Sequence, residues 1–208
     1  MNSYRVVSFA LYALVSAAIT SGVLYEDNAL NAERQRAKEF TDIGELLWFT
    51  RQSRSMAYMP RTACQSMMKA RQVQPGTFEY IVYYSTVSER RNMRAFVTEL
   101  TTSTSPTQSG PRLHPNVLSF RSSEITPAIP FKVMYADAIN GCFILVISFR
   151  GNIRACRVLQ RSSTVNRGFP PACRRVYAQN CPTESKYMYN SAFPIRISHI
   201  VHYDRSAN

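Results

Sequence analysis

Three histidines are the side chains of this sequence with the greatest potential for acid–base or metal chemistry. His114 lies in a loop-like segment, where it could exchange a proton with a substrate, although a loop histidine is more often simply solvated. His199 and His202 are three residues apart in a strand-like run, so they face opposite sides of the strand and are poorly placed to share a metal ion. We therefore assign no catalytic residue, no metal site and no cofactor.

Basic side chains give the chain a formal net charge of +12, and most of the excess lies in the C-terminal third. Guanidinium groups bind phosphates and carboxylates through a planar set of donors. Aromatic residues Phe169, Tyr177 and Tyr187 lie close to the basic ones in sequence. We interpret the series as a basic rim that binds a polyanion such as RNA, or an acidic face of a protein, with a solvated strand face as the alternative. The seven arginines follow one another without an intervening acid: Arg150, Arg154, Arg157, Arg161, Arg167, Arg174 and Arg175.

Five cysteines lie outside the first residues, and their spacing fits no zinc motif. In an exported protein this number predicts two disulfides and one remaining thiol among Cys64, Cys142, Cys156, Cys173 and Cys181. The sequence leaves their pairing open. Our working prediction joins Cys64 to Cys173 or Cys181, which would tie the N-terminal part of the chain to the C-terminal part.

The first residues have the layout of an export signal. Arg5 precedes an apolar run from Val6 to Ile19, and small residues accompany the end of that run, which is the order found in secretory signal peptides. A membrane anchor is the alternative, but the run is shorter than the ~18 to 20 apolar residues of a membrane span. We predict a signal peptide over residues 1–18 and a secreted, soluble mature chain without membrane association. Delivery into host cells is a further option.

The hydrophobic pattern divides the remainder into three regions. Helical periodicity over residues 28–50 and a polar, Met-rich stretch over 51–74 indicate an extension rather than a core. Strand-like and turn-like segments then alternate and predict the folded part of the protein. The predicted regions are an N-terminal extension, partly helical, at 22–72, an α+β domain at 75–175, and a C-terminal tail at 176–208 with candidate strands at 187–190 and 195–203.

The elements of the domain follow from local signals. Residues 78–84 are aromatic and β-branched and predict a strand. Thr86-Val87-Ser88-Glu89 forms a capping box, and the apolar residues after it fall at helical spacing, which predicts a helix over 87–100. Further strands are expected at 129–135 and in a hairpin over 142–160 that turns at residues 150–152. The fold class is therefore α+β, with one helix packed on a twisted antiparallel sheet and an N-terminal helical extension.

This order of elements resembles the fungal guanyl-specific ribonuclease fold and the RNase-like secreted effectors of powdery mildews. The strand and helix of 78–100 are similar to the opening pair of that fold, and Pro111-Arg112-Leu113-His114-Pro115-Asn116 lies where the family has a Tyr-Pro segment. Ile129-Pro130-Phe131 resembles its active-site strand, the 143–160 hairpin resembles its central hairpin, and Phe169-Pro170-Pro171-Ala172-Cys173 resembles its closing Phe-x-x-Cys. The resemblance covers residues 75–175 and implies a cysteine link back to the N-terminal region.

Departures from the ribonuclease pattern bear on catalysis. The family uses a glutamate base, a histidine acid and a phosphate-binding arginine. Ala128 stands at the position of the base, Cys142-Phe143-Ile144 lacks the arginine, and residues 159–161 lack the histidine. Glu124, the nearest carboxylate, lies four residues too early. The resemblance therefore implies a ribonuclease-like chain that does not cleave RNA.

Three hypotheses follow. The first is a secreted, effector-like protein of inactive ribonuclease-like fold that binds host RNA or a host protein. The second is an active secreted ribonuclease or toxin with relocated catalytic residues. The third is a generic disulfide-bonded secreted binding module of different fold, such as a barrel that holds a small ligand. A closed barrel without the 87–100 helix on the sheet would favour the third.

Overall fold

A computed structural model describes residues 22–53, 62–86, 93–148 and 154–191 of the chain. Antiparallel strands dominate this part, in the sheet order β2-β3-β4-β5-β6-β7-β8-β1-β9. The strands are β1 (Leu47–Ser53), β2 (Thr62–Gln74), β3 (Thr77–Thr86), β4 (Arg94–Ser103), β5 (Val117–Arg121), β6 (Ala128–Asp137), β7 (Cys142–Ser148), β8 (Arg154–Arg161) and β9 (Ser185–Tyr187).

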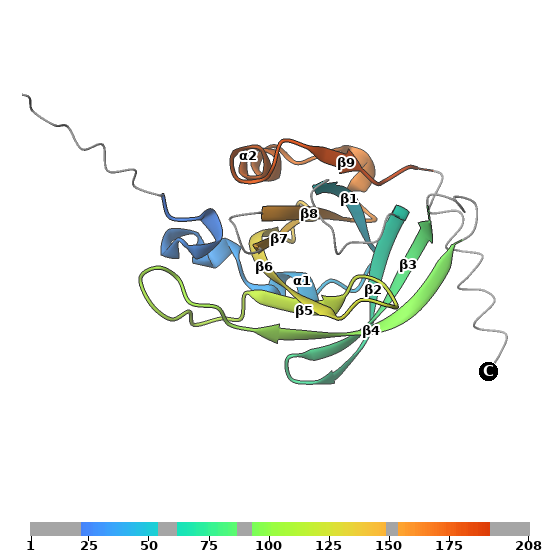
Figure 1. Ribbon diagram of the computed structural model, residues 1–208, viewed down its shortest axis with the longest axis horizontal. Helices are drawn as coiled ribbons and strands as arrows, with labels where there is room; N and C mark the ends of the chain where they lie inside the picture. The colour runs from blue at the N-terminus through green and yellow to red at the C-terminus, as the bar shows by residue number, and fades with distance from the viewer. Residues whose placement is uncertain (1–21, 54–61, 87–92, 149–153, 192–208) are drawn as a thin grey trace, which may run out of the picture.

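The sheet closes on itself into an eight-stranded barrel. The first residues of β1 pair with β2, Leu47 opposite Met67 and Trp48 opposite Ser66. The later residues of β1, Arg51–Ser53, pair instead with β9, which lies outside the ring. Figure 1 looks into the barrel, with α1 (Ala37–Thr41) at its opening and α2 (Pro171–Asn180) outside β8. The remaining helical turns are η1 (Tyr25–Asp27), η2 (Ala29–Arg34) and η3 (Val165–Arg167).

The prediction of a helix on a twisted sheet is therefore wrong, and β4 shows why. Residues 94–103 of the expected 87–100 helix form a strand that pairs with β3, with Tyr80 opposite Thr98. Along it the side chains of Thr98 and Leu100 are buried and those of Val97 and Glu99 are exposed. Phe96, Val97 and Leu100 suit a period of 3.6 on paper, but the alternation of a strand is the period that the barrel satisfies. Residues 87–92 lie outside the described residues.

Residues 28–74 also contain more strand than the sequence analysis predicts. The helical periodicity of 28–50 yields only short helical turns and α1, and the chain enters β1 at Leu47. The polar, Met-rich stretch over 51–74 contains β2, in which residues 64–67 are buried and residues 70–74 are exposed. The segment called an extension therefore supplies two of the eight barrel strands, because cross-strand pairing outweighs weak local preference.

Other sequence predictions are confirmed. Strands lie at 77–86 and 128–137, and β7 and β8 form the expected antiparallel hairpin, with Cys142 opposite Gln160. At the turn that leads into β7, Gly141 has φ +68°, and a Cβ on it would lie 2.3 Å from the Thr164 hydroxyl oxygen. A glycine is therefore required there both by conformation and by space. The candidate strand at 187–190 is misplaced, because β9 ends at Tyr187 and residues 188–190 are not in a strand; the candidate at 195–203 lies outside the described residues.

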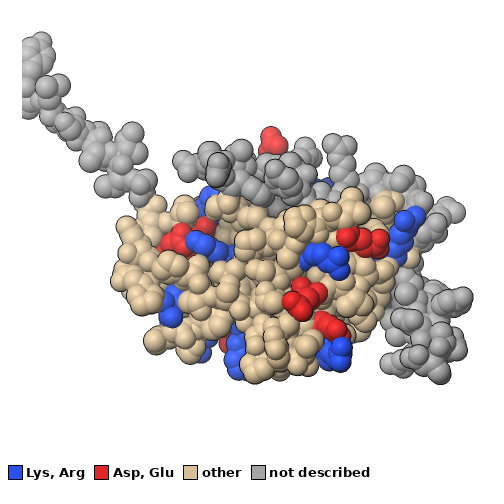
Figure 2. All heavy atoms as spheres, turned by 60° about the horizontal axis from the view of Figure 1, so that its bottom comes forward, with Lys and Arg blue, Asp and Glu red and all other residues tan. Residues whose placement is uncertain are grey.

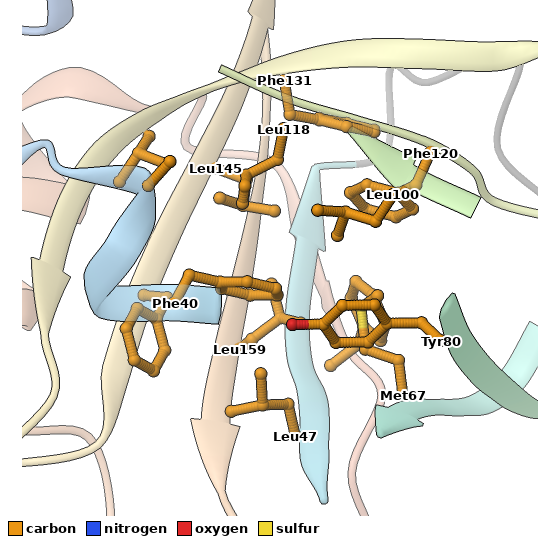
Figure 3. Close-up of a cluster of buried hydrophobic side chains, with 14 of the residues drawn as sticks. Phe40, Leu47, Met67, Tyr80, Leu100, Leu118, Phe120, Phe131, Leu145 and Leu159 are labelled. Carbon is orange, nitrogen blue, oxygen red and sulfur yellow. The ribbon is translucent and has the colours of Figure 1, made fainter. Parts of the chain in front are cut away.

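The barrel interior is a continuous apolar core. Its side chains come from all eight barrel strands and from α1, and Figure 3 shows them pointing toward one another. Phe40 of α1 contacts the ring of Phe143 edge-on, with 5.4 Å between centroids, and so covers one end of the interior. The residues labelled in the figure are Phe40, Leu47, Met67, Tyr80, Leu100, Leu118, Phe120, Phe131, Leu145 and Leu159.

A second apolar cluster lies on the outer face of the barrel, where α2 covers β6, β7 and β8. Two disulfides fasten α2 there, Cys142–Cys173 and Cys156–Cys181. The predicted pairing of Cys64 with Cys173 or Cys181 is therefore wrong. Cys64 takes part in neither bond and lies fully buried, with its sulfur 3.8 Å from that of Met93. The cysteines tie the C-terminal helix to the strands beside it rather than joining the two parts of the chain.

Glu45 holds the entry to β1 against the exit from β8. Its carboxylate accepts hydrogen bonds from the Arg161 side chain, from the Ser163 backbone N–H at 2.8 Å and from the Ser163 hydroxyl at 3.0 Å. Burial raises the pKa of Glu45, but the hydrogen bonds from Ser163 and Arg161 outweigh it and hold this pKa below the ordinary 4.5. A lowered pKa in the folded state means that Glu45 stabilises the protein most when it is ionised.

We expect Glu45→Gln to lower the free energy of unfolding by about 1 kcal/mol at pH 7, since it weakens charge-assisted hydrogen bonds at a half-buried site. The contribution is fully present above the unfolded pKa and is lost as pH falls through the lower folded pKa. The gap between wild type and variant should therefore close below about pH 4. Urea unfolding at pH 7 and pH 3 measures it, with the exposed Glu184→Gln as control. A gap that persists at pH 3 would contradict this account.

Candidate functional site

One arginine points into the apolar interior of the barrel. Arg157 lies on β8 between Cys156 and Val158, which face outward toward α2, so its own side chain faces inward. It is 0% exposed to solvent and is the largest charged side chain in the buried set. A buried charge among apolar side chains is rare, because desolvation costs several kcal/mol unless a partner offsets it. This position is therefore the first candidate for function.

Only neutral groups hold Arg157 among the residues that the structure describes. Its guanidinium donates to the side-chain oxygen of Gln65 and, at 3.4 Å, to the hydroxyl of Ser122. It lies 3.8 Å from the centre of the Phe49 ring, a cation–π contact. Gln65 in turn donates to the Ser122 carbonyl at 2.9 Å, which fixes its amide with the oxygen toward Arg157. The Arg157 Nε is buried and lacks a hydrogen-bond partner within the described residues.

The charge of Arg157 is not balanced by a buried acid in this part of the barrel. Two carboxylates are buried in the described residues, Glu26 and Asp137. Glu26 pairs with Arg154, and Asp137 pairs with the Asn140 turn, both on the outer face. Desolvation lowers the pKa of Arg157 to about 9, so the guanidinium remains charged at neutral pH at a cost in free energy. A negatively charged or strongly accepting ligand would recover that cost.

A second polar atom of the interior also lacks a partner among the described residues. The Tyr80 hydroxyl is buried and has no hydrogen-bond partner within the described residues. Figure 3 shows this hydroxyl directed into the core beside Leu159. Burial, with the nearby Asp42 charge, raises the pKa of Tyr80, so its proton stays in place as a donor. The interior therefore combines apolar side chains with two donors that lack a hydrogen-bond partner among the described residues.

The predicted arginine series does not form one surface. Arg154 faces outward and binds Glu26 at 2.6 Å, and Arg161 binds Glu45. Arg157 is in the interior, and Arg175 is exposed on α2. Arg167 and Arg174 line small pockets outside the barrel. Arg150 lies outside the described residues, and on the face shown in Figure 2 basic and acidic side chains are interspersed rather than gathered. Whether the outer arginines bind a partner stays a prediction.

The remaining candidates for chemistry lie apart from one another. His114 is exposed beside a shallow pocket formed with η2, and Glu124 accepts a hydrogen bond from Tyr84 at 3.2 Å. His199 and His202 lie outside the described residues. Within the described ranges, no three His, Cys, Asp or Glu side chains come together as metal ligands. None of the helices in those ranges has the length and apolar character needed to cross a membrane.

Sequence reasoning grouped Arg157 with its neighbours as one surface residue among seven. The signal that distinguishes it is the alternation of β8, in which Ala155, Arg157 and Leu159 share one face with the interior side chains. Gln65 and Ser122 carried no signal of their own, and Tyr80 is marked only as part of the predicted aromatic strand at 78–84. Gln65 comes from β2, Tyr80 from β3 and Ser122 from the residue after β5. Only closure of the barrel brings these three positions to one interior.

Comparison with known proteins bears on both the fold and the site. A family model described as tick histamine binding protein matches residues 25–193. A search of curated proteins gave no significant match. The matched family consists of secreted, non-enzymatic binding proteins, which confirms the expectation of an exported chain without catalytic activity. Delivery into host cells and binding of RNA or a host protein have no support.

The chain is also similar to several solved structures. H1 crustacyanin from the lobster Homarus americanus is 13% identical, with a TM-score of 0.51 over 74% of this chain and 82% of that one. Japanin from Rhipicephalus appendiculatus, bound to cholesterol, is 12% identical with a TM-score of 0.49 over 70% and 91%. Insecticyanin from the tobacco hornworm Manduca sexta is 9% identical, with 0.46 over 80% and 83%. The crustacyanin match supports a lipocalin-like barrel, so the ribonuclease resemblance is wrong.

Proposed function

Because this chain belongs to the tick histamine-binding protein family, we propose that it binds a small, mainly apolar ligand with an acidic group inside its barrel, with the acidic group against Arg157. The family and the lipocalin-like barrel support a ligand-binding role over the ribonuclease alternatives. The chemistry of the ligand is an inference from the side chains of the interior.

The single observation that carries the proposal is the uncompensated charge of Arg157. Its guanidinium is 0% exposed and, within the described residues, bonded only to neutral partners. A carboxylate that accepts from a guanidinium forms a strong hydrogen bond in such a medium. The surrounding aromatic and aliphatic side chains suit an alkyl or ring portion of the same ligand.

Histamine, which the family description names, carries a positive charge, opposite to that of the acidic ligand proposed for the interior. An ammonium group would need a carboxylate, and the buried carboxylates Glu26 and Asp137 face away from the interior. Two positive charges about 5 Å apart in a medium of low dielectric constant repel each other by several kcal/mol. The described interior therefore favours an anion over an amine.

Calorimetric titration of the mature protein with three probes tests this proposal. We expect oleate to bind at least tenfold more tightly than methyl oleate, because the ester keeps the chain but loses the charge that Arg157 recognises. Histamine should show no binding at the same concentrations. Equal affinities for oleate and its ester, or binding of histamine in preference to both, would contradict the proposed ligand chemistry.

A further inference from the structure

A pocket of about 520 Å³ lies outside the barrel, apart from the interior site. It lies between β1, β9 and the segment that leads from η3 into α2; Figure 1 shows β9 and α2 outside the barrel strands β1 and β8. Its floor contains Gln160, whose neighbour Leu159 points inward, so the barrel wall separates this outer pocket from the interior. The outer pocket is lined by Thr50, Arg51, Gln160, Val165, Gly168, Phe169, Arg174, Tyr187 and Tyr189.

Aromatic rings surround the guanidinium of Arg51 in this pocket. Its Cζ atom lies 4.4 Å from the centre of the Tyr187 ring, 5.2 Å from that of Tyr177 and 5.6 Å from that of Phe169. Arg51 also donates to the Tyr187 hydroxyl. Such contacts hold the side chain in place with its charge intact, because a ring face attracts a cation without neutralising it.

Arg174 adds a second positive charge at the mouth of the outer pocket. It is exposed on the first turn of α2 and donates to the Phe169 carbonyl at 3.1 Å, which orients it toward the pocket. It also lines the adjoining hollow together with Arg167. Within the described residues, no Asp or Glu lines either hollow. Two guanidinium groups thus share a concave surface that carries rings and, in that part of the chain, no negative charge.

We propose that the outer pocket binds a small planar organic anion, an aromatic carboxylate or sulfonate, independently of the ligand in the barrel. The volume suits a ligand of this size. Arg51 and Arg174 supply charge-assisted donors for the acidic group, and the Phe169, Tyr187 and Tyr189 rings supply surfaces for the ring of the ligand. A cationic aromatic ligand is excluded by the same two charges.

Titration of the full mature protein with naphthalene-2-sulfonate tests the inference. The protein is first saturated with oleate, so that binding of the probe inside the barrel does not contribute to the signal. We expect one binding site and an affinity that falls about tenfold in Arg174→Gln, the value of one charge-assisted hydrogen bond. Arg175→Gln is the matched control, because Arg175 is the exposed neighbour on the same helix and does not line the pocket. That variant should change affinity less than twofold.

A second variant separates the pocket from general attraction by basic charge. Tyr187→Leu removes a ring and keeps the apolar bulk of β9, and its side chain is 71% exposed, so the fold should persist. We expect it to weaken binding about tenfold as well. Absence of binding to wild type at millimolar probe, equal effects of Arg174→Gln and Arg175→Gln, or release of the probe by oleate would each overturn the inference. Arg157→Met should leave this binding unchanged, which separates the two sites.

Discussion

Replacement of Arg157 by methionine is expected to abolish the preference for oleate over methyl oleate. A hydrogen bond to a charged group contributes about 1.5 to 3 kcal/mol, so loss of the guanidinium should weaken oleate binding about 10- to 100-fold. The ester does not use the charge, and its affinity should change little. Calorimetric titration of wild type and variant with both probes measures the effect.

The stability of Arg157→Met distinguishes a binding role from a structural one. The charge is buried without an anionic partner in the described residues, so its removal recovers a desolvation cost that offsets the lost hydrogen bonds to Gln65 and Ser122. We therefore expect the free energy of unfolding of the ligand-free protein to stay equal or to rise. A loss of several kcal/mol would mean that Gln65, Ser122 and Phe49 need the guanidinium for folding itself.

Arg154→Met is the matched control on the same strand. Arg154 faces outward and pairs with the fully buried Glu26, so its removal leaves a buried carboxylate without its partner. We expect a loss of about 2 to 3 kcal/mol in the free energy of unfolding and no change in the oleate affinity of the folded protein. If Arg154→Met weakened oleate binding as much as Arg157→Met, the interior assignment would be wrong.

Removal of the Cys156–Cys181 disulfide is expected to lower stability by more than either arginine substitution. The bond closes a separation of 25 residues and holds the end of α2 against β8. A cross-link over a loop of that length stabilises the folded state by about 3 kcal/mol, mainly by restricting the unfolded chain. The variant with Cys156→Ala and Cys181→Ser together should lose about that amount, measured by urea unfolding under oxidising conditions.

Cys64→Ala provides the control for this experiment. Cys64 is buried but lies in neither disulfide, so its replacement should cost only about 1 kcal/mol through lost packing. Addition of reductant should then destabilise wild type and Cys64→Ala strongly, and the double variant less, because one of its two bonds is already absent. A double variant as stable as wild type would show that packing alone fixes α2.

Much of the strand content could be predicted from the sequence, but the closure of the sheet could not. Residues 77–86 and 142–148 are rich in aromatic and β-branched side chains, and this composition predicts strands there. Residues 94–103 carry apolar side chains at spacings that suit a helix and a strand equally, and the capping box before them favours the wrong one. Pairing with β3 and β5 decides for the strand, since it satisfies the backbone of all three.

The candidate site shows the same division. Composition and order indicated a secreted, disulfide-bonded, non-catalytic binding protein and drew attention to the arginines, because export signals, cysteine number and charge are local properties of a sequence. Which arginine is buried, which cysteines meet and which residues share the interior depend on side chains from strands far apart in the chain. Arg157 and Gln65 are 92 residues apart and meet only because β1 joins β8 to β2. Many long-range strand pairings together close the barrel. These pairings, which no local stretch of sequence specifies, decide which of the charged residues face the interior.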